Sequence, residues 1–317
     1  MDYVRLGKSE LVSSVVGLGG GSSGRFGLAK GGTKSDAISL IRTAVDEGIT
    51  FFDGAGICEN VDGLMADALA DCRQRVIVST KVHLGPDPFP LSDMRLANKV
   101  SFWISRRRGL VCTGPALRRR VERTLKVLRT DHIDLLQLHA VTVRQYPLAV
   151  ARVVPELLEM KAEGKLRAVG ITEGFLADPG HAMLKAALSD DWFDTIMAGF
   201  NFSNASAAES VFPAARKADV GVIGMFAMRG LIGRRGAGDA EPGVPFESID
   251  RLLEETGTKS LTELAYRYCR HQPGMDVVMT GTGDPEHLRE NIAAALLPPL
   301  PSEVLDRLRM FSPARPV

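Results

Sequence analysis

The sequence predicts one α/β domain over residues 1–317, a (β/α)₈ TIM barrel. Short apolar runs typical of strands alternate with amphipathic stretches typical of helices, and eight such units fit into the 317 residues. Strands that alternate with helices pair in parallel, and eight units of this length fit a barrel that closes on itself. A doubly wound open sheet is the competing arrangement, because hydrophobic periodicity alone does not separate the two.

The first half of the chain contains four of these units. Helical periodicity gathers Ile38, Ile41 and Val45 on one face, and the helix that Pro115 opens carries an apolar stripe that includes Leu117. The expected strands cover residues 15–18, 50–53, 76–81 and 133–139, and the expected helices cover residues 35–47, 63–71, 115–128 and 154–163.

The second half continues the alternation. The expected strands cover residues 166–171, 195–200, 221–225 and 277–280, and the expected helices cover residues 181–188, 207–218, 261–270, 285–294 and 302–311. Two connections are unusually long, residues 85–112 after the third strand and residues 229–248 after the seventh. Both follow strands, so both are expected on the face where barrel enzymes carry their sites. Loops of this length often act as lids.

Composition and charge exclude several classes of protein. Hydrophobic residues make up 45% of the chain and charged residues 24%, which argues against a disordered or fibrous protein. Lysine and arginine number 39 against 38 acidic residues, without the basic excess of a nucleic-acid binder. No apolar run reaches the ~20 residues that span a bilayer, and no signal-peptide pattern opens the chain.

The positions of the cysteines indicate the cellular compartment in which the protein is expected to work. The four cysteines are scattered and show no metal-ligand spacing. We therefore expect a cytoplasmic protein that binds a small molecule and holds no metal, with neither nucleic acid nor membrane as partner. The sequence leaves the oligomeric state open.

Three polar residues end consecutive predicted strands. Asp53 follows the apolar residues Phe51 and Phe52, Lys81 ends the third strand, and His139 ends the fourth. In a barrel the carboxyl ends of the strands meet on one face, so these three side chains are expected in one small volume. There Lys81 can pair with Asp53, and His139 can hydrogen-bond a substrate oxygen or move a proton.

Five segments carry motifs of one enzyme family. They are Y-V-R-L-G at residues 3–7, F-D-G-A at 52–55, S-T-K at 79–81, T-D-H-I-D-L-L-Q-L-H at 130–139 and G-T-G-D-P-E-H-L-R-E-N at 281–291. Through these segments the chain resembles the aldo-keto reductases along essentially its whole length. The segment at residues 130–139 is the most specific, since it is a near-complete match to the longest signature of the family.

The resemblance implies a fold and a reaction. It implies a (β/α)₈ barrel whose lower end is closed by an N-terminal β-hairpin, with NADPH lying extended across the C-terminal face. The nicotinamide would transfer a hydride to a carbonyl carbon, and a set of Asp, Tyr, Lys and His would handle the proton. On this chain the Asp is Asp53, the Lys is Lys81 and the His is His139.

The resemblance also implies the cofactor contacts. Glu173 stands where the family has the asparagine that holds the nicotinamide carboxamide, Met197 stands where it has a glutamine, and His287 stands where a basic residue often binds the 2′-phosphate. The expected contacts are Gly19, Thr172, Glu173, Met197, Phe226, Met228, Gly281, Thr282, Gly283, His287, Glu290 and Asn291. NADPH is the expected cofactor, and NADH stays open because of His287.

The segment at residues 281–291 also suggests anion binding on its own chemistry. Gly281 and Gly283 let the backbone approach a phosphate closely. Asp284 is a preferred N-cap residue for the helix that is expected to begin at Pro285, and the first amides of a helix attract an anion.

Cys58 is the largest departure from the family pattern, because it occupies the position of the catalytic tyrosine. A thiol with an ordinary pKa of about 8.5 becomes a thiolate beside a lysine, and a thiolate donates no proton. Three interpretations stay open. The substrate needs no tyrosine, as for an iminium or a polarised alkene; another acid replaces it, with His83, Tyr146 and Lys81 as candidates; or catalysis has been lost.

Two functions follow from these interpretations. The first is an NAD(P)H-dependent oxidoreductase that transfers a hydride to or from a carbonyl or imine-type small molecule, with a proton donor other than the tyrosine. The alternative is a catalytically silent NADPH-binding protein with a regulatory or structural role. A nucleophilic role for Cys58 is a further, weaker option.

Overall fold

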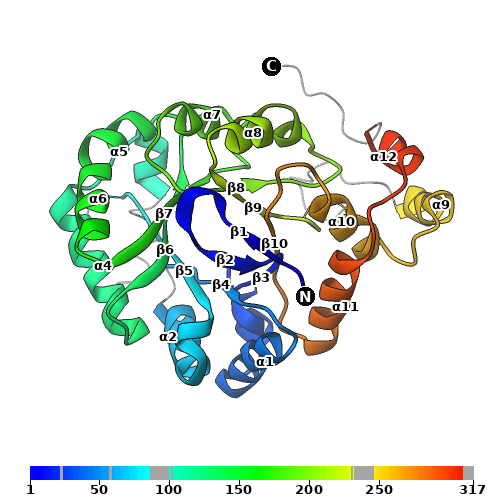
Figure 1. The fold of residues 1–317 in the computed structure, drawn as a ribbon, viewed down its shortest axis with the longest axis horizontal. Coiled ribbons are helices and arrows are strands. Elements are labelled where there is room, and N and C mark those ends of the chain that lie inside the picture. The colour runs from blue at the N-terminus through cyan, green and yellow to red at the C-terminus, as the bar shows by residue number, and fades with distance from the viewer. Residues whose placement is uncertain are drawn as a thin grey trace.

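Eight parallel strands close into a barrel, which confirms the predicted fold class (Figure 1). The computed structural model describes residues 1–21, 24–56, 59–85, 100, 103–229, 231 and 246–309. β10 pairs with both β3 and β9, which excludes the open sheet. The strands are β3 (Val16–Gly19), β4 (Phe51–Asp53), β5 (Ile77–Val82), β6 (Ile133–Val141), β7 (Leu166–Glu173), β8 (Thr195–Gly199), β9 (Gly221–Met225) and β10 (Val277–Thr280).

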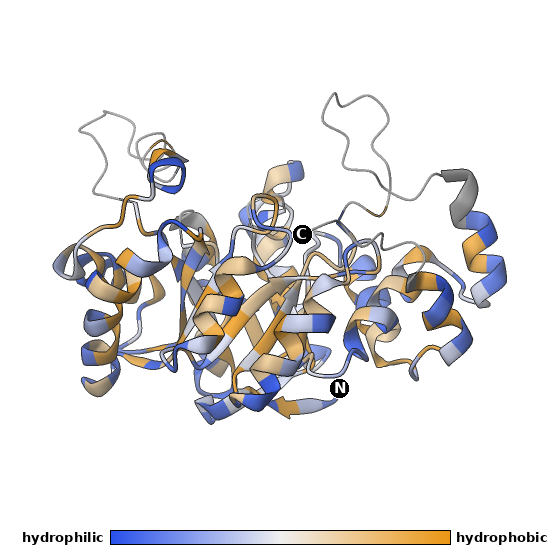
Figure 2. Cartoon of the chain, turned by 90° about the horizontal axis from the view of Figure 1, so that it is seen from above, coloured by the Kyte–Doolittle hydropathy of each residue, from blue (hydrophilic) through white to orange (hydrophobic). Residues whose placement is uncertain are grey.

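Helices surround the barrel and turn their apolar sides toward it (Figure 2). The α-helices are α1 (Lys34–Asp46), α2 (Glu59–Ala68), α4 (Gly114–Leu128), α5 (Tyr146–Arg152), α6 (Val154–Ala162), α7 (Ala182–Ser189), α8 (Ser206–Lys217), α9 (Phe246–Thr256), α10 (Leu261–Arg270), α11 (Pro285–Leu296) and α12 (Ser302–Arg309). The 3₁₀ helices are η1 (Gly7–Ser9), η2 (Arg25–Lys30) and η3 (Ala70–Arg75).

Two of these helices are absent from the sequence-based prediction. α5 is only seven residues long, too short for a helical period to stand out. α9 begins inside the connection predicted at residues 229–248 and packs beside α12, where Arg307 pairs with Glu255 at 3.1 Å. No helix in the described ranges is long and apolar enough to cross a membrane.

An antiparallel hairpin closes the N-terminal end of the barrel, as the resemblance implied (Figure 1). It consists of β1 (Tyr3–Arg5) and β2 (Val12–Ser14). Its connecting residues Leu6 and Leu11 join a buried layer with residues from seven strands: Phe51, Ile77, Leu135, Ala168, Met197, Ile223 and Val277. This layer fills the lower half of the barrel, so chemistry is left to the C-terminal mouth.

Two loops touch at the C-terminal end through their backbones. Gly27, in η2, has a φ of 95°, a conformation that favours glycine. A Cβ atom on Gly283, which follows β10, would lie 2.3 Å from the Cα of Gly27. A side chain at Gly283 would therefore push these two loops apart.

Candidate active site

Asp53 and Lys81 form a buried ion pair at the mouth of the barrel. Both side chains are more than nine-tenths buried, and Lys81 Nζ contacts Asp53 Oδ2. Lys81 Nζ also donates to the carbonyl of Gly54 at 2.9 Å. The sequence-based expectation that these two residues come together is therefore met. An ion pair this dry has a fixed geometry, because breaking it would leave a buried charge.

Two residues that the sequence reasoning missed hold the other carboxylate oxygen of Asp53. Ser79 Oγ donates to Asp53 Oδ1 at 2.9 Å, and Gln137 Nε2 donates to the same oxygen at 3.2 Å and to Ser79 Oγ at 2.8 Å. The signal was in the sequence, since Gln137 is a polar residue inside an apolar strand and lies two positions before His139. Ser79 and Gln137 therefore fix the orientation of the carboxylate that holds Lys81.

His139 sits at an irregularity in β6. The register with β7 shifts between Leu138 and Val141, Ala140 has a φ of 50°, and the amide of Ala140 donates to Thr172 Oγ1 at 2.7 Å. Bulges of this kind re-aim side chains beside active sites. Thr172 thus supports the strand that carries His139.

The surroundings of His139 keep its imidazole neutral. Burial, helped by the positive charges of Lys81, His83 and Arg106, lowers the pKa of His139 to about 3. A neutral imidazole can hydrogen-bond a carbonyl oxygen but carries no surplus proton near neutral pH. His139 therefore fits an orienting role, and the proton must come from another group.

The structure distinguishes between the residues that were considered as proton donors. Cys58 lies outside the described residues. Tyr146 is buried, and its hydroxyl donates at 2.8 Å to Asp190, which follows α7. Asp191, next to Asp190, pairs with Lys8 beside the hairpin at the opposite end of the barrel. Tyr146 is thus engaged in the helical layer, away from the mouth.

His83 is buried, not solvated, and its charge acts on His139. It lies just beyond the end of β5, and its carbonyl accepts from Arg120 at 2.8 Å. The structure therefore keeps Lys81 and His83 as candidate acids near His139.

Asp62, on α2, is a second buried acid behind this site. Its Oδ2 accepts from Thr80 Oγ1 at 3.0 Å. Its other oxygen lies against Gly54, where an added Cβ would approach it to 2.1 Å. Burial raises the pKa of Asp62 to about 6, although Thr80 and Lys81 oppose this shift. Gly54 thus leaves the space that Asp62 fills, directly behind the carbonyl that binds Lys81.

This shift predicts a pH-dependent stability. A raised pKa means that the folded state binds the proton more tightly than the unfolded chain, so the contribution is complete below pH 3.8 and is lost as the pH rises through about 6. Relative to the wild type, Asp62→Asn should gain about 2.4 kcal/mol of unfolding free energy between pH 4 and pH 7.5. Urea unfolding across this range measures the difference.

Asp67→Asn is the matched control on the same helix. Hydrogen bonds from Lys34 and Arg129 lower the pKa of Asp67, so the Asp67 carboxylate stabilises the folded state more as the pH rises. The free energy of unfolding of Asp67→Asn should therefore fall relative to the wild type as the pH rises. A constant difference between Asp62→Asn and wild type at every pH would contradict the assignment.

Glu173 is occupied within the protein. Its carboxylate accepts from the amide of Gly199 at 2.8 Å and pairs with His181 Nδ1 at 2.8 Å. His181 Nε2 lies 2.9 Å from Ser206 Oγ. Both members of the Glu173–His181 pair are fully buried, and burial raises the pKa of Glu173. Glu173 is thus held at the end of β7 by His181, which begins α7, and by the backbone of Gly199.

Met197 belongs to the buried apolar cluster inside the barrel, and the register of β8 with β7 pairs it with Thr172. The side chain is apolar and 3% exposed, so it replaces a polar cofactor contact with core packing. Met197 and Glu173 stay predictions as cofactor contacts, since the first offers only an apolar side chain and the second is paired with His181.

The residues after β9 do lie at the mouth. Phe226 has a φ of 74°, which is unusual for a bulky residue and typical of functional sites. Asn201 Nδ2 donates to the carbonyls of Phe226 and Arg229, both at 2.9 Å, and so fixes this turn. The ring of Phe226 packs 5.8 Å from that of Phe175, and Met228 is half-buried. The guanidinium of Arg229 lies 4.7 Å from the centroid of the Phe226 ring, so one face of this ring is already covered.

The segment after β10 is only partly free to bind an anion. Asp284 caps α11 as predicted, but it does so by accepting from the amides of Glu286 and His287, which are therefore occupied. Asn291 Nδ2 donates to Thr280 Oγ1 at 2.7 Å. The side chain of His287 is 65% exposed, and the backbone at Gly281 is open.

These observations test the fit of a nicotinamide cofactor. Next to Gly281, an added Cβ would meet only the carbonyl of Gly19, at 3.8 Å, so the backbone there is open to a close approach. Thr282 Oγ1 accepts from the amide of Asp284, Gly283 is half-buried, and Glu290 is exposed. Open glycines, an exposed imidazole and the Phe226 turn fit an extended dinucleotide along this edge.

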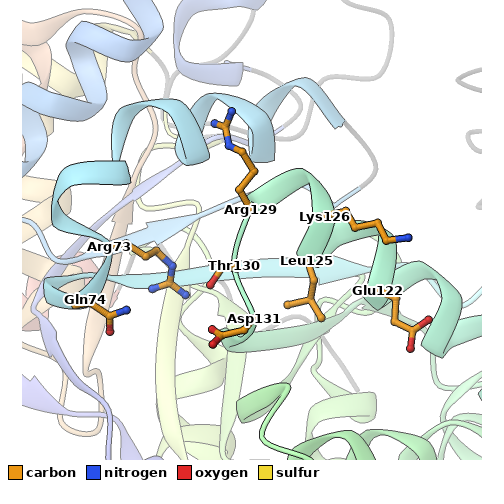
Figure 3. A pocket seen from close by; sticks show the side chains of 8 residues that line it. All are labelled: Arg73, Gln74, Glu122, Leu125, Lys126, Arg129, Thr130 and Asp131. Carbon is orange, nitrogen blue, oxygen red and sulfur yellow. The ribbon is translucent and has the colours of Figure 1, made fainter.

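A hollow on the described surface lies elsewhere. It has a volume of about 770 Å³ and opens between η3 and the end of α4 (Figure 3). Arg73 and Asp131 precede β5 and β6, so the hollow belongs to the N-terminal end of the strands. It is therefore separate from the Asp53–Lys81 pair, which lies at their carboxyl ends.

Comparisons with known proteins agree with this architecture. The chain is 26% identical over 301 residues to L-galactose dehydrogenase of Arabidopsis thaliana, covering 91% of this chain and 86% of that protein. It is 27% identical over 320 residues to aldo-keto reductase YhdN of Bacillus subtilis, covering 91% and 87%. The holo form of aldo-keto reductase AKR11C1 from Bacillus halodurans has the same fold, with a TM-score of 0.77 and 24% identity over 99% of this chain and 97% of that one.

The family comparison covers nearly the whole chain. The model of the Aldo/keto reductase family matches residues 15–312. The members of this family are oxidoreductases that transfer a hydride between a nicotinamide cofactor and a small molecule. The match, the closed barrel and the paired Asp53 and Lys81 beside His139 together place this chain in the aldo/keto reductase family.

Proposed function

We propose that this protein is an NADPH-dependent oxidoreductase that reduces a carbonyl or imine-type small molecule in the cytoplasm, with a proton donor other than tyrosine. One observation carries the proposal: the buried ion pair of Lys81 and Asp53 is intact beside a neutral His139. A chain that had lost catalysis would have no need to keep a buried charge pair, which is costly to desolvate.

The residues of the chain divide the work. His139 hydrogen-bonds the substrate oxygen as a neutral imidazole, and Asp53 together with the carbonyl of Gly54 orients the ammonium of Lys81. When bound, the cofactor supplies the hydride. We assign the proton to Lys81, because the register of β5 with β6 pairs Lys81 with Gln137 and turns it to the side of His139. An iminium substrate would need no proton at all.

The cofactor assignment rests on the edge between β3 and β10. Gly19 and Gly281 would lie along the phosphates, and the exposed His287 would meet the 2′-phosphate. The turn that contains Phe226 would pack on the nicotinamide. We leave Glu173 and Met197 out of this set, because the first is paired with His181 and the second is core.

Titration with NADPH and NADH tests the cofactor. Trp103, in the connection after β5, is 64% exposed, and a nicotinamide bound at the mouth should quench its fluorescence, whereas Trp192 follows Asp191 at the opposite end of the barrel. We expect binding of NADPH in the micromolar range, tighter than NADH by about tenfold, as one charge-assisted contact would give. His287→Ala should remove the difference between the two nucleotides, whereas Glu290→Ala should not.

The nucleotide titration and a panel of substrates also test the alternative function, a silent nucleotide-binding protein. If neither nucleotide binds, the oxidoreductase assignment is wrong. If NADPH binds but no aldehyde, ketone or imine in a broad panel is turned over, the protein is the silent nucleotide-binding protein that Cys58 also suggests.

A further inference from the structure

We propose that Asn201 is a positioning residue for the cofactor, because it holds the turn after β9 in place at the mouth of the barrel. The turn covers residues 226–229, and Asn201 lies just beyond the end of β8, in the neighbouring loop. The inference rests on the proposed function, in which this turn packs on the nicotinamide. Asn201 acts on the cofactor only through the turn.

The turn has a backbone conformation that requires support. Phe226 has a φ of 74°, which a residue with a bulky side chain adopts only where its surroundings hold it. The amide of Arg229 closes the turn by donating to the carbonyl of Phe226 at 3.0 Å. Arg229 is exposed, so the contact of its guanidinium with the Phe226 ring is open to solvent and does not fix the turn alone. A further, buried contact is therefore needed.

Asn201 provides this contact. Its Nδ2 donates to the carbonyls of Phe226 and Arg229, both at 2.9 Å, so one amide group holds both ends of the turn. Asn201 is 3% exposed, so this amide group is shielded from water. The backbone also joins the two segments, since the amide of Phe200 donates to the carbonyl of Met225 at 3.0 Å. The loop after β8 and the turn after β9 thus form one unit.

The oxygen of the same side chain is fixed as well. Asn201 Oδ1 accepts from the amide and the hydroxyl of Ser203, at 2.9 and 2.8 Å, and from the amide of Asn204 at 3.2 Å. These groups are donors and the two carbonyls of the turn are acceptors, so only one orientation of the Asn201 amide satisfies both sides. The side chain therefore cannot rotate without losing hydrogen bonds at both ends.

A turn that is held in this way favours binding, because it is ordered before the cofactor arrives. Phe175 adds to this order. Its ring lies 5.8 Å from that of Phe226, and a Cβ atom on Gly199 would lie 2.4 Å from it. Release of the turn should therefore weaken cofactor binding and leave Lys81 and His139, which lie on other strands, in place.

Asn201→Asp tests the proposal. The substitution keeps the oxygen that faces Ser203 and Asn204, but it replaces Nδ2 by an oxygen that the carbonyls of the turn repel. We expect the Kd for NADPH, measured by the fluorescence titration without substrate, to rise about tenfold, as the loss of two ordinary hydrogen bonds would give. Asn201→Ala should give a similar rise without adding a carboxylate, and circular dichroism establishes that each variant is folded. An unchanged Kd in folded Asn201→Ala would overturn the proposal.

Asn204→Ala is the matched control in the same loop. Asn204 Oδ1 accepts from the amide and the hydroxyl of Ser206, at 3.2 and 2.6 Å, so this side chain supports the start of α8. Its removal should lower stability but keep the Kd for NADPH within about twofold of the wild type. If Asn204→Ala weakens NADPH binding as much as Asn201→Asp does, the effect is one of general stability and the proposal fails.

Trypsin provides a readout that needs no nucleotide. It cleaves after Arg229, at the peptide bond whose carbonyl accepts from Asn201. Cleavage follows the population of the opened state, so Asn201→Asp should be cut there about tenfold faster than the wild type, and Asn204→Ala at the wild-type rate. Equal rates in all three proteins would overturn the proposal. If the wild type binds neither nucleotide, the proposed function is wrong, whereas faster cleavage of Asn201→Asp would still support the hold of Asn201 on the turn.

Discussion

Lys81→Met is expected to lower kcat for carbonyl reduction by about a thousandfold, within the 10²–10⁴ range that positioned acid–base groups contribute. Lys81 is the donor that Asp53 and the carbonyl of Gly54 hold at the mouth, and the neutral His139 cannot replace it. The affinity for NADPH should change by no more than about twofold, because Lys81 is not among the proposed cofactor contacts. Steady-state rates and the fluorescence titration measure the two effects separately.

Two further variants make this result interpretable. Lys81→Met leaves the carboxylate of Asp53 buried without its cation, so the double variant with Asp53→Asn controls for lost folding. His83→Ala should cost less than about tenfold if Lys81 is the donor. If His83→Ala lowers kcat as much as Lys81→Met does, His83 is the proton donor. If Lys81→Met leaves turnover unchanged, the assignment of Asp53, Lys81 and His139 to one active site is wrong.

Glu173→Ala is expected to destabilise the protein by about 3 kcal/mol, because it leaves two buried groups, the imidazole of His181 and the amide of Gly199, without their hydrogen-bond partner. The substitution leaves His181 without its carboxylate and the amide of Gly199 without its acceptor, in a region with no access to solvent. Urea unfolding at pH 7 measures the loss.

An exposed ion pair on another helix provides the control. Glu159 lies 3.4 Å from Arg118 and its side chain is 66% exposed, so Glu159→Ala should cost less than about 1 kcal/mol. The His181→Gln variant should be as unstable as Glu173→Ala, and the double variant should lose much less than the sum, because the two residues share one interaction. Additive losses would mean that Glu173 and His181 act independently.

The sequence was sufficient for the barrel and for the three strand-end residues. Parallel strands bring their carboxyl ends to one face, so Asp53, Lys81 and His139 could be placed together from their positions alone. The hairpin and the cap at Asp284 were also predictable, the first from the family resemblance and the second from its residue type.

The rest of the site depends on side-chain orientations that are set by residues far away in the sequence, so neighbouring residues do not predict them. Glu173 turns to His181 because His181 begins α7 in a left-handed conformation, with a φ of 60°. Arg106 reaches the mouth only through the path of a long connection, and Asp62 reaches Gly54 from a separate helix. Tyr146 could be excluded only when its partner Asp190 was seen. Cys58 stays a prediction, because it lies outside the described residues.

The backbone contact between η2 and the loop after β10 couples two positions that are far apart in the sequence, Gly27 and Gly283, so that substitution of one affects the other. Gly27 needs glycine for its φ, and Gly283 needs it because any side chain would collide with Gly27. A substitution at Gly27 or Gly283 alone, whether it arises in evolution or in a mutant library for altered cofactor preference, would have to move both loops. Diversity in such a library belongs at His287 and its exposed neighbours, with the two glycines held constant.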